Sequence, residues 1–290
     1  MFSGAYTALV TPFNRDGSID FGKFSALIER QAESGIDGIV PVGTTGESPT
    51  LSFDEHSQVV AAAVEAAGGR MQVIAGTGSN ATSEAVTLTR HAREAGATAT
   101  LQVTPYYNKP SQEGLYRHFS EVAAIGLPVV LYNVPGRTSR EIAVDTVVRL
   151  AEVPNIACVK EAGGSVDRVS AILNRCDICV LSGDDPLTLP MMVAGATGVI
   201  SVASNIVPEA VVRLTRLALE GNWVGARAVH RQYYQLFCDC FLDTNPVPIK
   251  AAMAMAGLIE ENYRLPLCSM DDTLKERLRH TLADAGVELT

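Results

Sequence analysis

The sequence has no long apolar run and no strongly basic segment. No stretch reaches the roughly 18 apolar residues that a membrane span requires, and the start, Met1 to Tyr6, lacks the basic and apolar regions of a secretory signal. The formal net charge of −9, with no basic stripe to offset it, would repel a polyphosphate backbone. We therefore expect a cytoplasmic protein that binds neither membrane nor nucleic acid.

Cysteine is sparse, with six residues among 290, so a dense disulfide framework is not expected. Two local pairs, Cys176-x-x-Cys179 and Cys238-x-Cys240, each lack a second pair at the spacing of a zinc site. Reduced, mostly buried thiols are favoured over a metal site.

Short apolar runs alternate with longer amphipathic stretches from Ala5 to about Val202, which is typical of βα units around a parallel sheet. The expected strands are Tyr6 to Thr11, Gly38 to Val42, Gln72 to Gly76, Thr98 to Thr104, Pro128 to Asn133, Ile156 to Lys160, Ile178 to Ser182 and Gly198 to Val202. Nearly every run is apolar enough to be buried on both faces, whereas an open sheet would leave edge strands. No glycine-rich nucleotide fingerprint follows the first run. These features favour a closed (β/α)₈ TIM barrel of the α/β class.

Helices are expected where apolar residues recur at three and four. They cover Phe21 to Glu33, Phe53 to Ala67, Ser83 to Glu94, Gln112 to Ala124, Val144 to Ala151, Glu209 to Glu220, Trp223 to Phe241, Ile249 to Leu258 and Met270 to Ala285. The pattern places the barrel in residues 1–220 and a C-terminal helical extension, packed on the barrel, in residues 221–290.

Active sites of such barrels are built where the strands end, so the polar residues there are the first candidates. Lys160 is the only one of five lysines that ends an expected strand. Its amine would enter the barrel mouth over an apolar floor, where burial lowers the pKa of a lysine and frees its lone pair for attack on a carbonyl. A lysine that reaches solvent or pairs with Glu161 stays open as the alternative.

Other strand ends carry groups that would complement an imine-forming lysine. Tyr132 ends the adjacent strand and could shuttle protons, although a core tyrosine is also consistent with the pattern. The turn Gly43-Thr44-Thr45-Gly46 offers backbone N–H groups and hydroxyls suited to a carboxylate. Arg137, in a loop, could bind a second carboxylate or lie on the surface.

A metal-dependent aldolase is the competing mechanism, because a divalent ion can stabilise the same enolate. The five histidines all fall in helix-like stretches. The remaining acidic candidates are Glu47, Asp184 and Asp185, and the last two are favoured as caps of a helix that would start at Pro186. No metal or other cofactor is expected.

With these residues assembled, the sequence resembles the dihydrodipicolinate synthase family, also called 4-hydroxy-tetrahydrodipicolinate synthase, among the N-acetylneuraminate-lyase-like barrels. The resemblance covers essentially the whole chain. The motifs that carry it are Ala8 to Phe13, Val42 to Ser48, Ala75 to Gly78, Val103 to Tyr107, Leu131 to Thr138, Val159 to Ala162, Leu181 to Asp185, Gly198 to Val202 and Asn245 to Lys250.

The resemblance implies a class I lyase in which pyruvate forms an imine with Lys160. The derived enamine would attack L-aspartate-4-semialdehyde, giving a precursor of diaminopimelate and lysine. By matching position, Tyr132 would be the proton donor and acceptor, with Thr44 and Tyr107 as its relay. The substrate contacts implied in the same way are Thr45, Ile200, Gly183 and, for the semialdehyde carboxylate, Arg137.

The resemblance also implies assembly and regulation. In this family Tyr107 typically reaches its relay across a dimer interface, so a homotetramer built from two tight dimers is expected. L-Lysine inhibits part of the family, and the corresponding positions are Ser48, His56, Asn80, Glu84 and Tyr106. Phe53 stands where lysine-sensitive members often have histidine.

Two further functions stay open at this point. A sibling lyase would use the same lysine on N-acetylneuraminate or a 2-keto-3-deoxy sugar acid. A catalytically silent barrel would act as a binding or regulatory protein, because a fold alone does not determine a function.

Overall fold

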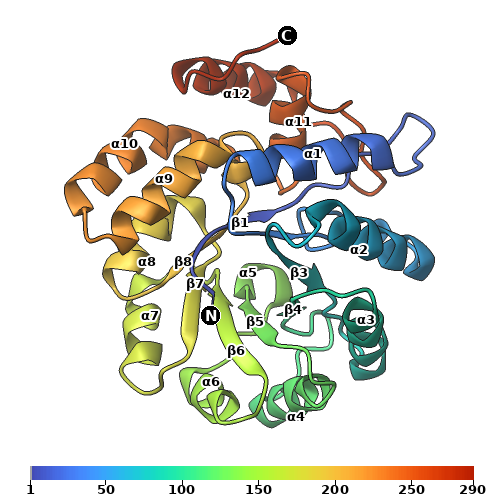
Figure 1. Ribbon diagram of the computed structural model, residues 1–290, viewed down its shortest axis with the longest axis vertical. Helices are drawn as coiled ribbons and strands as arrows, with labels where there is room; N and C mark the ends of the chain where they lie inside the picture. The colour runs from blue at the N-terminus through green and yellow to red at the C-terminus, as the bar shows by residue number, and fades with distance from the viewer. Residues whose placement is uncertain (1) are drawn as a thin grey trace.

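The computed structural model describes residues 2–290, so Met1 lies outside the described part of the chain. Eight parallel strands form a closed barrel in which each strand pairs with the next and β1 pairs with β8 (Figure 1). The strands are β1 (Gly4–Ala8), β2 (Gly38–Val40), β3 (Gln72–Gly76), β4 (Ala99–Val103), β5 (Val129–Asn133), β6 (Ile156–Glu161), β7 (Cys179–Ser182) and β8 (Gly198–Ser201). The expected α/β barrel and its eight strands are confirmed.

The first strand differs most from its expected range. It begins at Gly4 and ends at Ala8, although the apolar run continues through Val10. The Leu9 amide still donates to the Val40 carbonyl of β2, but the Val10 amide donates to the Asn205 side chain and not to a strand. An apolar run alone does not show where such a ladder ends.

Helices surround the barrel (Figure 1). They are α1 (Phe21–Glu33), α2 (Phe53–Ala67), α3 (Thr82–Glu94), α4 (Gln112–Ala123), α5 (Pro135–Thr138), α6 (Val144–Ala151), α7 (Val166–Leu173), α8 (Thr188–Val193), α9 (Pro208–Leu219), α10 (Trp223–Asp239), α11 (Val247–Met255) and α12 (Asp272–Asp284), with 3₁₀ turns η1 (Ser48–Thr50), η2 (Asp185–Leu187) and η3 (Ala203–Asn205). Arg137 was expected in a loop and lies instead in the short helix α5.

The interior of the barrel is a packed core that includes two thiols. Cys158 on β6 and Cys179 on β7 are register partners, and their Sγ atoms lie 3.2 Å apart. All six cysteines are free thiols, as expected. The neighbouring pair, however, is brought together by strand pairing and not by either of the local cysteine motifs.

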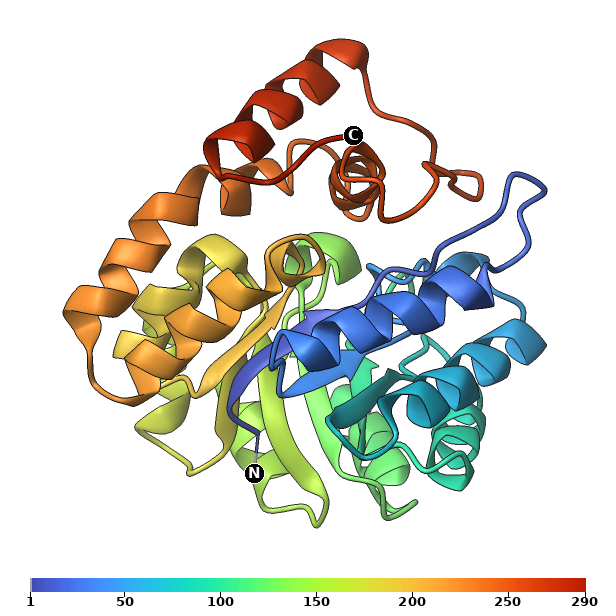
Figure 2. The same cartoon turned by 45° about the horizontal axis from the view of Figure 1, so that its top comes forward.

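The last three helices lie on one side and one end of the barrel. α10 packs against α9, while α11 and α12 pack against each other beyond the end of the barrel that carries α5 (Figure 2). This is the end at which the strands terminate, so the C-terminal segment lies beside the candidate site. Among residues 2–290, no helix is long and apolar enough to cross a membrane.

Candidate active site

Lys160 and Tyr132 lie side by side at the ends of neighbouring strands. The β5–β6 register places Tyr132 directly opposite Lys160. Both side chains are buried, and Lys160 Nζ lies 4.4 Å from the centre of the Tyr132 ring. The sequence placed these residues on adjacent strands, and the register makes them direct neighbours.

The surroundings of Lys160 favour the neutral amine. Burial lowers the pKa of Lys160 from 10.5 to about 8; the negative charge of Asp185 raises it in part, and the positive charge of Arg137 lowers it further. A lysine with this pKa holds a free lone pair in a useful fraction of molecules at neutral pH.

Glu161 does not pair with Lys160, so this alternative from the sequence is wrong. Its carboxylate accepts hydrogen bonds from Asn133 Nδ2 at 2.9 Å and from Arg168 Nε at 2.7 Å. Successive residues of a strand point to opposite faces, which directs Glu161 toward the helices and Lys160 into the barrel. The amine therefore makes no ion pair in the part of the chain that the structure describes.

Gly183 leaves room for the side chain of Lys160. A Cβ atom at this position would lie 2.8 Å from Lys160 Cε and 2.8 Å from Ala162 Cβ. Any larger residue would displace the lysine, so glycine is required here by close approach.

Asp185 is a structural anchor and not the helix cap that the sequence favoured. Its carboxylate is buried, accepts from the amides of Val202 at 2.9 Å and Ala203 at 3.1 Å, and binds the Ser201 hydroxyl. The Asp184 side chain likewise makes no capping hydrogen bond to η2. These contacts hold the segment after β8 against the segment after β7.

The turn after β2 brings Thr44 and Thr45 to the same place. Thr45 is buried, and its Oγ1 accepts a hydrogen bond from Asn245 Nδ2 at 3.0 Å. Burial raises the pKa of the Tyr132 phenol, which the Arg137 charge and a hydrogen bond with Thr44 lower in part. A phenol in this state stays protonated at neutral pH and can donate its proton.

A cavity of about 480 Å³ collects these groups. Its polar lining residues are Thr44, Thr45, Tyr132, Arg137, Lys160, Asp184 and Asn245, and Gly183 and Val202 contribute to its wall. Ile200 is fully buried in β8, two residues before Val202.

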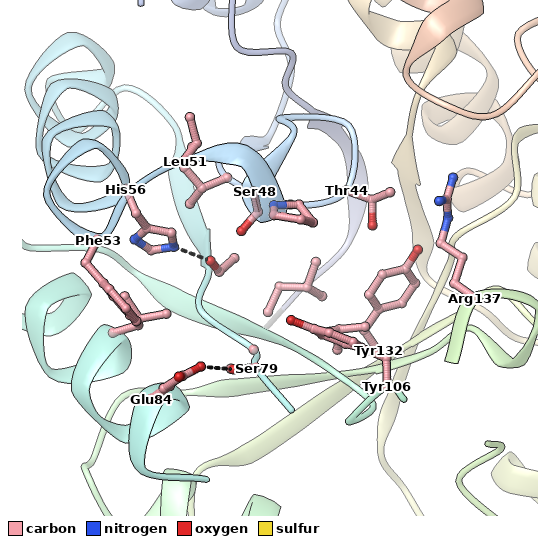
Figure 3. Close-up of a pocket in the computed structure, with 18 of the residues that line it drawn as sticks. Thr44, Ser48, Leu51, Phe53, His56, Ser79, Glu84, Tyr106, Tyr132 and Arg137 are labelled. Carbon is pink, nitrogen blue, oxygen red and sulfur yellow. Dashed lines mark hydrogen bonds between the residues drawn. The ribbon is translucent and has the colours of Figure 1, made fainter. Parts of the chain in front are cut away.

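A second cavity, of about 330 Å³, adjoins the first and shares Thr44, Tyr132 and Arg137 with it. Figure 3 shows these three residues at one end and Phe53, His56 and Glu84 at the other, with Ser48 between. Tyr106 lines this cavity too. Four of the five positions expected for L-lysine are thus gathered around one space.

Besides Ile200, two expected residues do not line either cavity. Tyr107 is 90% exposed, with a left-handed backbone (φ 72°), so it contributes nothing to the site of its own chain. Asn80 contacts the neighbouring loop, where its carbonyl accepts from Asn108 Nδ2 at 2.8 Å, and Ser79 lines the cavity in its place.

Asn245 belongs to the site although its individual role was not foreseen. Its side chain donates to Thr45, and its carbonyl accepts from Arg137 Nη2 at 2.9 Å. It therefore touches both candidate carboxylate-binding residues. The motif Asn245-Pro246-Val247-Pro248 was visible in the sequence, but its distance along the chain concealed these contacts.

The metal candidates are dispersed. The five histidines lie on α2, α3, α4, α10 and α12, as expected. Within residues 2–290, no group of three His, Cys, Asp or Glu side chains is arranged to hold a metal ion.

Comparison with known proteins identifies the family of the chain. The family model described as the dihydrodipicolinate synthetase family matches residues 1–285. The chain belongs to this family. A relative from Aquifex aeolicus named 4-hydroxy-tetrahydrodipicolinate synthase is 50% identical over 100% of this chain and 99% of its own length. The expected family and its class, lyase enzymes, are thereby confirmed.

Solved structures of the family superpose closely on the chain. Dihydrodipicolinate synthase from Aquifex aeolicus has a TM-score of 0.98 at 49% identity, with both chains fully covered. The Acinetobacter baumannii enzyme, solved in complex with pyruvate, has a TM-score of 0.98 at 43% identity, covering 99% of this chain and 100% of its own. The Cyanidioschyzon merolae enzyme, solved with lysine bound, has a TM-score of 0.96 at 39% identity and 99% coverage of both chains.

Proposed function

We propose that the protein is a 4-hydroxy-tetrahydrodipicolinate synthase that condenses pyruvate with L-aspartate-4-semialdehyde through an imine on Lys160. The observation that carries this proposal is the buried strand-end amine of Lys160, with its pKa lowered to about 8, beside the Tyr132 phenol. The name shared by full-length relatives at about half identity supports the reaction.

The chemistry follows from the groups in the cavity. Lys160 Nζ attacks the ketone carbon of pyruvate, and the carbinolamine loses water to give the imine. Loss of a methyl proton gives an enamine, whose carbon adds to the aldehyde; cyclisation through the amino group of the semialdehyde then releases Lys160. Tyr132 carries protons in these steps, with Thr44 and Tyr107 of the partner subunit as its relay.

The two carboxylates are assigned to two parts of the cavity. Thr45 and the backbone near Ile200 bind the carboxylate of pyruvate, while Gly183 keeps the space beside Lys160 open. Arg137 receives the carboxylate of the semialdehyde, since a guanidinium matches a carboxylate with two hydrogen bonds. The Asn245 carbonyl accepts a hydrogen bond from Arg137 Nη2 and so helps to fix the position of the guanidinium.

Borohydride reduction tests the mechanism. Pyruvate with borohydride should add one fixed mass to a peptide that contains Lys160, and K160R should remove the adduct. An adduct on another lysine refutes the role of Lys160, whereas no adduct at all refutes the imine mechanism and leaves a binding barrel. Steady-state assays of pyruvate with each aldehyde then separate this synthase from N-acetylneuraminate and sugar-acid lyases, and EDTA should leave the rate unchanged.

We also propose a cytoplasmic homotetramer built from two tight dimers. The 90% exposure of Tyr107, outside the site of its own chain, supports a site completed by a partner. Mixing inactive K160A with weakly active Y107F should restore activity, because one site of each hybrid dimer combines an intact Lys160 with the partner's Tyr107. No gain after subunit exchange, verified by mass spectrometry, would contradict the shared site.

L-Lysine is the proposed inhibitor, bound by Ser48, His56, Glu84 and Tyr106, which line the second cavity, together with Asn80, which follows the lining residue Ser79. The Glu84 carboxylate on the cavity wall and the lysine-bound structure of the Cyanidioschyzon merolae relative support this assignment. Saturating L-lysine should lower the initial rate and raise the melting temperature. E84A should abolish both effects, whereas F53H should strengthen them. If the wild type shows neither effect, regulation by lysine is excluded.

A further inference from the structure

The turn that carries Thr44 and Thr45 has a strained backbone on both sides. Val42 has φ 51° and Glu47 has φ 55°, both in the left-handed region. This region is unfavourable for residues with a side chain and most unfavourable for a β-branched residue such as valine. Strain of this kind persists only where surrounding contacts hold the backbone in place. The contacts of the turn therefore determine its shape.

Glu47 ties the turn to a helix outside the barrel. Its Oε1 lies 2.5 Å from Lys250 Nζ on α11, and its Oε2 accepts from the Arg264 amide at 3.2 Å. The side chains of Glu47 and Lys250 are both 0% exposed. Lys250 Nζ also donates to the Thr11 carbonyl at 3.1 Å and lies 4.4 Å from the centre of the Phe13 ring.

A fully buried ion pair is a poor source of net stability, because removing two charges from water offsets most of their attraction. A well-packed apolar pair would often be as stable. The charged pair differs in its geometry, since both oxygens of Glu47 have directed partners. Two more hydrogen bonds secure the same turn: Thr11 Oγ1 to Gly46 O at 2.7 Å, and Asn245 Nδ2 to Thr45 Oγ1 at 3.0 Å.

We propose that Glu47 and Lys250 are positioning residues, which hold the Thr44–Thr45 turn in the conformation that receives the carboxylate of pyruvate. Neither residue lines the cavity of Lys160, so the pair acts through the turn. The inference rests on the proposed role of Thr45. It makes α11, which lies outside the barrel, part of the substrate-binding apparatus.

The double variant E47Q/K250M tests this role. A single substitution would leave one buried charge unpaired and could unfold the protein, whereas the double variant removes both charges. We expect a folded protein with a pyruvate KM raised about tenfold, the loss that accompanies a weakened hydrogen bond to a charged group. At saturating pyruvate, the borohydride adduct on Lys160 should still form to the wild-type extent, because the lysine itself is undisturbed.

A matched control separates positioning from general stability. Arg277 and Asp239 form a 2.6 Å ion pair between α12 and α10, away from the turn, and R277M should lower the melting temperature without changing the pyruvate KM. E47D, which keeps both charges but shortens the reach of the carboxylate, should raise this KM and serves if the double variant does not fold.

Four results would count against the inference or against the site on which it rests. A wild-type pyruvate KM in a folded E47Q/K250M or in E47D overturns the inference, as does an equal rise in R277M. T45V reports the carboxylate site directly: if it leaves the KM unchanged, the proposed site is refuted and the positioning role with it. If T45V raises the KM while a folded E47Q/K250M or E47D does not, only the positioning role is refuted.

Discussion

The lowered pKa of Lys160 predicts how imine formation depends on pH. Only the neutral amine attacks pyruvate, so the rate should rise with pH and level off above the pKa of the free enzyme. With the pKa at about 8, roughly one amine in ten is neutral at pH 7, against about one in three thousand for a lysine of pKa 10.5. The apolar surroundings of Lys160 thus supply about 300-fold more nucleophile.

The assay is rapid mixing with limiting pyruvate, followed by a borohydride quench and mass analysis of the Lys160 peptide. A plot of the second-order rate constant against pH should bend near pH 8. R137M should move the bend to higher pH, because the Arg137 charge lowers the pKa of Lys160. A rate that climbs without a bend to about pH 10, as for an ordinary lysine, would refute the reasoning.

Three further predictions concern buried charges. K160M should raise the free energy of unfolding at pH 7 by about 1–3 kcal/mol, measured by urea titration. This gain should shrink between pH 8 and 10.5, because in that range the folded site has lost a proton that the unfolded lysine keeps. A gain that stays constant with pH would contradict the assigned pKa. D185N should cost about 1–3 kcal/mol of stability, because the Asp185 carboxylate accepts several hydrogen bonds. It should also move the bend in the rate profile to lower pH, because the Asp185 charge raises the pKa of Lys160. A shift of the bend to higher pH would contradict this prediction. R168M should cost about 3–5 kcal/mol by leaving the buried Glu161 carboxylate without its cationic partner. R149M, which breaks an exposed pair with Glu113, should change the stability little. Equal losses in R168M and R149M would refute this distinction.

The parts of the fold and site that the sequence revealed are those with short-range signatures. Strands and helices were visible because their apolar residues recur with fixed periods. The position of Lys160 at the end of a strand, and of Tyr132 on the adjacent strand, follows from counting βα units. The register that places them directly opposite each other does not follow from this order, because the β5–β6 pairing contains a shift between Val129 and Val130.

The parts that could not be foreseen depend on contacts between distant segments. From the sequence, Glu161 was a plausible partner for Lys160, but its carboxylate accepts hydrogen bonds from Arg168 and Asn133. Asp185 looked like a helix cap because it precedes Pro186, but its hydrogen-bond donors belong to the segment after β8, which is distant along the chain. The role of Tyr107 in the proton relay remains a prediction, because the site that it would complete lies on another subunit.

The contact between the Thr11 carbonyl and Lys250 spans 239 residues, and that between Thr45 and Asn245 spans 200. During synthesis, all eight strands leave the ribosome before Lys250 does. At about 5–20 residues per second, several seconds pass in which Lys160 exists but the turn lacks its anchor. A nascent chain is therefore expected to hold a nucleophile without a finished substrate pocket, and catalysis begins only when the end of the chain has folded onto its beginning.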